Sequence, residues 1–241
     1  MKYRFLARHI TFCALIFSAF AATGRTNDKA LNRPYADLKA VHFGFSVGMT
    51  MQNLRITNNG YTTETGEQWI ADVPAISPGF TVSVLADMRL GDYFNFRVSP
   101  GMQFANKVVK FYDANEVSEM QSQNIRSTYV LLPLEIKYSG LRYKNFRPYL
   151  IGGVMGVLDV GKRRSEQLML NQLDCMLTVG IGLDFYLPFF KLCPELKFCF
   201  GLLNVLKKNR PDLDDNPVMM NFTRSVDKIA NNMVVLTFYF E

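Results

Sequence analysis

The feature that most constrains the fold of this chain is an alternation of apolar and polar residues with a period of two. From Val41 to Gln52 the sequence reads VHFGFSVGMTMQ, in which every second residue is Val, Phe or Met and the others are His, Gly, Ser, Thr or Gln. A strand sends successive side chains to opposite faces, whereas a helix would mix the two sets. The pattern therefore predicts a strand with one apolar and one polar face.

Further segments of the same extended character follow along the chain. The eight predicted strands comprise residues 41–52, 79–90, 93–104, 129–138, 147–159, 174–187, 194–202 and 233–241. Seven of them have one distinctly apolar face. The two faces of the glycine-rich segment 147–159 are too alike to assign, and its orientation stays open.

The connections between these strands alternate in length. Short connections are expected at 91–92, 140–145 and 188–190, and long ones at 53–77, 106–127, 160–171 and 203–232. Short turns at one end, long loops at the other and an even number of strands are typical of bacterial outer-membrane barrels. The sequence therefore predicts an all-β fold, an eight-stranded antiparallel up-and-down transmembrane β-barrel with short periplasmic turns and long extracellular loops.

A secreted soluble barrel or sandwich would show a similar alternation, because it hides its apolar face in a core. Two observations favour the membrane. The apolar faces of the seven assigned strands carry no charged residue, as expected where a charge at the bilayer midplane costs about 2 to 4 kcal/mol. Their many Phe and Leu side chains would also be hard to fit inside eight strands. Outer-membrane lipid is therefore the expected partner of this face.

The N-terminus predicts export from the cytoplasm. Lys2, Arg4 and Arg8 precede an apolar run at 10–22 that contains the small-x-small signal Ala19-Phe20-Ala21. This is typical of a cleaved secretory signal peptide. We expect residues 1–21 to be the signal peptide, 22–40 a short periplasmic segment and 41–241 the barrel, located in the outer membrane of a Gram-negative cell.

The polar faces of the predicted strands carry charges of both signs. The residues expected to form an interior charge network are Asp87, Arg89, Arg97, Glu135, Lys137, Asp184, Glu195 and Lys197. The interior of an eight-stranded barrel is just wide enough for side chains to fill it, which argues against a diffusion pore. Buried charges are tolerated when they are paired, so a structural plug is the favoured interpretation, with a proton or ion path as the alternative.

No residue pattern indicates catalysis or a cofactor. The chain beyond residue 40 has one histidine, His42, and lacks GxSxG, HExxH and phosphate-loop motifs. Cys175, Cys193 and Cys199 have no CxxC spacing, so neither a disulfide framework nor a metal site is indicated. The net charge of +6 comes without a cluster of basic and aromatic residues, which argues against nucleic acid as a partner.

Four segments of the chain resemble the PorT family of Bacteroidetes outer-membrane β-barrels. They are FYLPFFKLCPELKFCFGLLNVL, YVLLPLEIKYSG, FRPYLIGGVMG and VVLTFYFE. The pattern F-Y-L-P-x-F-K-x-x-P-E-L-K in the first is the most specific to PorT, whereas "RPYLxGG" and "LPLxIKY" are shared with many barrels. The resemblance implies a non-enzymatic accessory component of the type IX secretion system, which exports proteins with C-terminal sorting domains and serves gliding motility in some relatives. Other secretion components would then be its partners. The alternative is a general small barrel with a structural, adhesive or uptake-related role.

Overall fold

The computed structural model describes residues 31–61, 69–72, 77–113, 119–161, 171–207 and 225–241. The chain divides into two compact units, Met1–Leu31 and Asn32–Glu241. The predicted signal peptide, residues 1–21, lies outside the described residues. The second unit holds all the strands described below.

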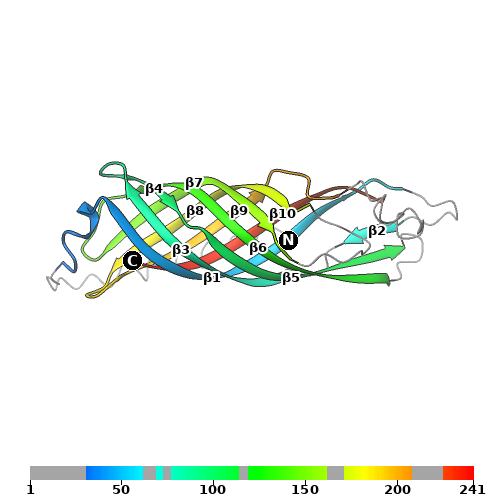
Figure 1. The fold of residues 1–241 in the computed structure, drawn as a ribbon, viewed down its shortest axis with the longest axis horizontal. Coiled ribbons are helices and arrows are strands. Elements are labelled where there is room, and N and C mark those ends of the chain that lie inside the picture. The colour runs from blue at the N-terminus through cyan, green and yellow to red at the C-terminus, as the bar shows by residue number, and fades with distance from the viewer. Residues whose placement is uncertain (1–30, 62–68, 73–76, 114–118, 162–170, 208–224) are drawn as a thin grey trace, which may run out of the picture. The chain divides into compact units, whose positions relative to one another are not determined.

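Ten strands form a single antiparallel sheet in the described part of the chain (Figure 1). They are β1 (Val41–Asn58), β2 (Trp69–Asp72), β3 (Ser77–Arg89), β4 (Phe94–Val98), β5 (Gly101–Asp113), β6 (Glu119–Ser139), β7 (Phe146–Asp159), β8 (Leu173–Tyr186), β9 (Lys191–Gly201) and β10 (Val226–Phe240). The sheet closes on itself because β1 pairs with β10 along one edge and with β3 along the other. The closed ring leaves no free edge through the barrel wall.

The ring has eight positions, as predicted for the barrel, because two of the ten strands do not add one. Strands β4 and β5 occupy a single position, since both pair with β3 on one side and with β6 on the other. The predicted strand 93–104 is therefore interrupted at Ser99-Pro100, where proline has no N–H to donate to a neighbouring strand. The short strand β2 pairs with the end of β5, outside the ring.

Several strands are longer than the alternation predicted. Strand β6 begins at Glu119 and β5 extends to Asp113, so the predicted long loop 106–127 is mostly a paired hairpin. Strand β10 likewise begins at Val226, within the predicted loop 203–232, and continues the pairing with β1. The apolar–polar alternation does not identify these extensions, because a strand outside the lipid does not need an apolar face.

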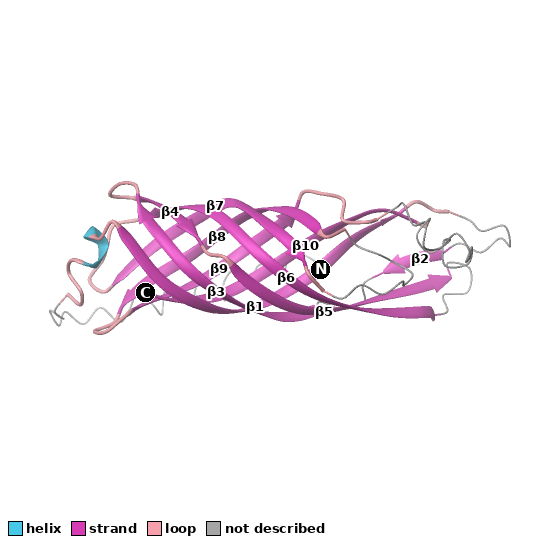
Figure 2. Ribbon diagram, viewed as in Figure 1, coloured by secondary structure: helices cyan, strands magenta, loops and turns pink. Residues whose placement is uncertain are grey.

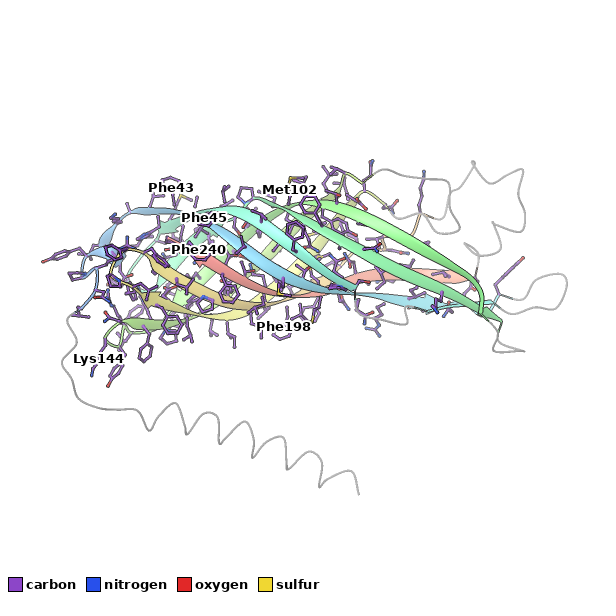
Figure 3. All side chains as sticks on the ribbon, turned by 90° about the horizontal axis from the view of Figure 1, so that it is seen from below. Phe43, Phe45, Met102, Lys144, Phe198 and Phe240 are labelled. Atoms are coloured by element: carbon purple, nitrogen blue, oxygen red, sulfur yellow. The ribbon has the colours of Figure 1, made fainter. Side chains whose placement is uncertain are left out.

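The outer face of the barrel is covered with apolar side chains (Figure 3). Phe43, Phe45 and Phe198 are exposed on it, and burial alternates residue by residue along β1. Aromatic rings on adjacent strands stack, as Phe45 and Phe240 do with ring centroids 5.0 Å apart. Such cross-strand pairs stabilise a sheet face, and an outward apolar band is the surface that lipid requires.

The structure also settles the orientation of the predicted strand 147–159, which is β7. Tyr149, Ile151 and Met155 are buried inside the barrel, whereas Leu150 and Val154 are exposed outside. The two faces looked alike in sequence because the interior is itself partly apolar at this strand. Apolarity alone could therefore not identify the lipid face here.

The end of the barrel with the short turns carries the one helical element among the described residues, the 3₁₀-helix η1 (Ala36–Leu38) (Figure 2). It belongs to the segment that leads into β1. Within the described ranges, no helix is long and apolar enough to cross a membrane.

Candidate functional site

Seven of the eight charged residues predicted for the interior meet inside the barrel, in the half nearer the short turns. These seven are Asp87, Arg97, Glu135, Lys137, Asp184, Glu195 and Lys197. None is more than 5% exposed. They come from β3, β4, β6, β8 and β9, so strands far apart in sequence supply them.

Arg97 lies at the centre of this charge network. Its Nε and Nη2 atoms donate to Asp87 Oδ2 at 3.1 and 3.0 Å, and Nη1 donates across the barrel to Glu195 Oε2 at 2.9 Å. The side chain is completely buried. The planar guanidinium has five donors in a fixed geometry, so one residue can hold carboxylates from different strands.

Two lysines extend the network. Lys197 Nζ donates to Glu135 Oε2 at 2.9 Å and lies 3.1 Å from Glu195 Oε1, so it bridges two acids. Lys137 Nζ donates to both oxygens of Asp184, at 2.9 and 2.8 Å. Each buried charge thus has an oppositely charged neighbour, as burial in a medium of low polarity requires.

Tyrosine side chains fill the space between the charges. The Tyr149 hydroxyl donates to Glu195 Oε2 at 2.9 Å, while Lys137 Nζ lies 4.0 Å from the centre of the Tyr149 ring. Arg97 lies over the rings of Tyr149 and Tyr239. Gly182 makes room for Tyr149, because a Cβ at Gly182 would lie 2.2 Å from Tyr149 Cζ. Aromatic faces stabilise buried cations by attraction between the positive charge and the ring.

Two members of the network were missed by sequence reasoning. Lys191 forms ion pairs with Glu241 and, at 3.9 Å, with Asp184. Glu241 also lies 3.6 Å from Arg97. Lys191 is the first residue of β9 and Glu241 follows β10, so neither falls on the polar face of a predicted strand between two assigned neighbours. The spacing of two from Lys191 to Glu195 through Cys193 was the signal that could have placed Lys191 inside.

The prediction for Arg89 needs correction. Its guanidinium is directed to the β3–β4 turn, where Nη2 donates to Asp92 Oδ1 at 2.6 Å and Nε donates to the Gly91 carbonyl at 3.1 Å. The Arg89 side chain is 28% exposed. Arg89 is the last residue of β3. It lies on the inward face of the strand as predicted, but at the rim of the barrel, beyond the interior.

The other half of the interior combines an apolar cluster with buried polar side chains such as Gln52, Gln103 and Asn231. A buried cluster there comprises Tyr129, Leu131, Met155, Val157, Met176, Cys199, Met233 and Val235. The polar face of the predicted strand 41–52, with its Gly, Ser and Thr residues, gives no sign of this apolar cluster. The cluster is supplied in part by the inward residues Tyr129 and Leu131 of β6 and Met155 and Val157 of β7, where both faces of the strand are apolar.

A cavity of about 30 Å³ lies where the two halves meet, lined by residues that include Ser46, Gln103, Met155, Lys197 and Thr237. It has room for about two water molecules. A second cavity, of about 10 Å³, is lined by residues that include Leu54, Tyr129 and Asn231. The ion-pair network ends at the apolar cluster. Within the residues that the structure describes, the charges therefore do not form a path from one end of the barrel to the other.

Comparison with known proteins identifies the family. The family described as outer membrane protein beta-barrel domain matches residues 27–207. This chain belongs to that family. It is an outer-membrane β-barrel, and its outer apolar band lies in the lipid of that membrane.

Solved structures of outer-membrane proteins are similar to this family member at low identity. OprG from Pseudomonas aeruginosa is 14% identical over 82% of this chain and 93% of its own, with a TM-score of 0.47. Neisserial surface protein A is 10% identical over 83% of this chain and 98% of its own, with a TM-score of 0.43. The N-terminal β-barrel domain of OprF from Pseudomonas aeruginosa is 15% identical over 80% and 97%, with a TM-score of 0.35. No curated protein matches the chain.

Among the described residues of this outer-membrane barrel, the remaining reactive side chains are one histidine and three cysteines. His42 is half-buried near the start of β1. Cys193 and Cys199 are buried in the interior, Cys175 is half-buried on β8, and all three are free thiols. Among the described residues, no group of three or more His, Cys, Asp or Glu side chains has the arrangement of a metal site.

Proposed function

We propose that this outer-membrane barrel is a non-enzymatic component of the type IX secretion system, of the PorT kind, and that it supports the export of proteins with C-terminal sorting domains. The observation that carries the proposal is the filled interior. An eight-stranded barrel packed with ion pairs at one end and apolar side chains at the other does not conduct a protein. Such a barrel acts through its surfaces and the partners that it contacts.

The PorT-like segment supports the link to secretion. Residues 185–197 form the end of β8, the turn and the first part of β9. This one hairpin supplies Lys191, Glu195 and Lys197 to the charge network. The segment that resembles PorT most closely thus supplies three charged residues of the network.

Deletion of the gene, followed by analysis of the culture medium and the periplasm, tests the proposal. We expect cargo with C-terminal sorting domains to accumulate in the periplasm, and a plasmid copy of the gene to restore its secretion. Other outer-membrane proteins should keep their normal abundance in the deletion strain. Normal secretion of sorting-domain cargo would refute the proposal and leave a general structural, adhesive or uptake-related barrel.

The non-enzymatic part of the proposal has a separate test. Purified barrel should leave outer-membrane lipids and denatured proteins unmodified, as judged by mass spectrometry after prolonged incubation. A covalent change that depends on the folded barrel would contradict it.

A further inference from the structure

A short segment before β1 lies across the periplasmic end of the barrel. We call residues Asn32–Leu38 the strap. The Asn32 backbone N–H donates to Asn145 Oδ1 at 2.9 Å, in the β6–β7 turn, and its side-chain Nδ2 donates to the Tyr186 carbonyl at 3.0 Å. Arg33 Nη1 donates to the Glu241 main-chain oxygen at 3.0 Å. The strap is therefore tied to three separate places around this end.

The carboxylate of Asp37 anchors the other end of the strap. It accepts a hydrogen bond from the Tyr186 hydroxyl at 2.6 Å and lies 3.7 Å from Arg142 Nη1 and 3.9 Å from Arg147 Nη1. The Arg142 guanidinium lies 3.6 Å above the Tyr186 ring, and Arg147 donates to the carbonyls of Gly140 and Asp92. Arg142 also donates to the Lys144 carbonyl in the β6–β7 turn and to the main-chain oxygens of Asn32 and Arg33 in the strap. Two guanidinium groups and a phenol thus surround one carboxylate, with Arg147 and Tyr186 held by the barrel and Arg142 shared between the barrel and the strap.

The strap also lies next to the charge network. Glu241 links the strap to this network. Its main-chain oxygen accepts a hydrogen bond from Arg33, and its carboxylate forms ion pairs with Lys191 and Arg97. The thiol of Cys193 lies 3.9 Å from the same carboxylate and is fully buried. Displacement of the strap would therefore give water access to Glu241 first and to Cys193 next.

The two ends of the barrel are closed in different ways. At the end with the long loops, Val205 and Leu206 are buried together with Leu54, Val226 and Ile229. Opening that end would expose apolar surface to water, which is unfavourable.

The strap buries little apolar surface by comparison. Ala36 is its one buried side chain, and Tyr35 and Leu38 are exposed. Its contacts are hydrogen bonds and ion pairs, which water or another carboxylate can replace. Such exchangeable contacts contribute only modestly to stability.

We propose that the strap is a displaceable plug of the periplasmic mouth, and that Arg142, Arg147 and Tyr186 form a carboxylate-binding site. Asp37 occupies the site in the closed barrel. An acidic segment of a periplasmic protein occupies it when the strap is displaced. The outer end stays shut throughout, so the opened barrel is a chamber that faces the periplasm and not a channel.

Cys193 provides a native reporter of the closed state. In a protein that carries Cys13→Ala, Cys175→Ala and Cys199→Ala, a membrane-impermeant maleimide would react with Cys193 alone. We expect slow labelling of the folded barrel and labelling at least about tenfold faster after Asp37→Asn, because the substitution removes the charge that pairs with Arg142 and Arg147. Arg33→Gln, which removes a different anchor, should have the same direction of effect.

Two controls separate plug opening from general loosening. Lys39→Gln changes a charge on an exposed side chain just after the strap and should leave the labelling rate unchanged. Asn204→Ala removes a side-chain oxygen that accepts the N–H groups of Leu206 and Ile229 at the opposite end, and it should also leave the rate unchanged. Heat-dependent gel mobility would establish that each variant is folded. Equal labelling of the parent protein and both strap variants would overturn the plug.

The carboxylate site has its own experiment. A synthetic peptide of residues 32–38 should slow the labelling of the Asp37→Asn protein, whereas the same peptide with Asn in place of Asp37 should have little effect. Arg142→Gln combined with Arg147→Gln should abolish the protection by the first peptide. Equal protection by the two peptides would overturn the carboxylate site and leave the plug standing.

Discussion

The two halves of the barrel interior are filled by different kinds of side chain. The periplasmic half holds charged side chains, with Arg97 between Asp87 and Glu195, whereas the outer half holds an apolar cluster around Met176. An apolar side chain needs only a neighbour of suitable shape, but a buried charge needs a partner at a specific position. The charged half should therefore tolerate fewer substitutions than the apolar half, although both are equally buried.

Arg97→Met gives the largest expected effect. The substitution keeps much of the volume but leaves Asp87, Glu195 and Glu241 without their shared cation inside the barrel. Removing one partner of a buried ion pair typically costs about 3 to 5 kcal/mol. Reversible urea unfolding in lipid vesicles, followed by tryptophan fluorescence or gel mobility, would measure the loss.

The matched substitution in the apolar half is Met176→Leu. Met176 is fully buried, and a swap that conserves volume usually costs less than about 1.5 kcal/mol. Equal losses for Arg97→Met and Met176→Leu would show that the charged half is no more demanding than the apolar half.

A double-mutant cycle on Lys137 and Asp184 tests pairing more directly. Lys137→Met alone removes the cation that donates to both Asp184 oxygens, and Asp184→Leu alone leaves Lys137 unpaired. The double variant should lose less stability than the sum of the two, with a coupling of about 1 to 3 kcal/mol in urea unfolding. Additive losses would mean that the two residues contribute independently. Lys191 lies 3.9 Å from Asp184 and would keep the coupling below its maximum.

Gly182→Ala should disturb the tyrosine layer of the charged half. The new methyl group would collide with the Tyr149 ring and displace the hydroxyl that donates to Glu195. Overpacking of this kind costs about 1 to 3 kcal/mol. Gly152→Ala is the control, because the nearest atom to its Cβ would be 3.7 Å away. A similar loss of unfolding free energy for both variants would rule out the collision as the cause.

Arg89→Gln should have the smallest effect. Arg89 pairs with Asp92, which is exposed in the β3–β4 turn, and pairs in contact with water contribute at most about 1 kcal/mol. The unfolding midpoint should hardly move, and its small difference from that of the parent protein should shrink as salt is added, because salt screens exposed ion pairs. A loss close to that of Arg97→Met would place Arg89 in the network after all.

The sequence predicted the strands and their lipid-facing residues more fully than the packing of the interior side chains. Alternation along residues such as 41–52 and 79–90 assigned the lipid face correctly, because lipid excludes every charge from it. The interior follows no such simple rule. Strand β7 could not be oriented, since Ile151 inside and Leu150 outside are equally apolar.

Positions at the strand ends were the hardest to assign. Arg89 and Lys191 both lie beside a short turn, yet Arg89 is directed to the rim and Lys191 to the interior. The alternation places a residue on one face of a strand, but it does not say how far the interior extends along that face. The pairing of Lys191 with Glu241 depends on the register between β9 and β10.

The sequence by itself determined that this chain forms eight strand positions with one face for lipid and one for the interior. The physical reason is local, since the side-chain period of a strand and the exclusion of charge from lipid both act residue by residue. The tertiary structure decided which charges meet, where the apolar cluster begins and how residues 32–38 cover the periplasmic end. Those outcomes depend on closure of the ring, which brings β4 opposite β9 and the strap beside Glu241. A local sequence pattern cannot predict contacts between segments so far apart in the chain.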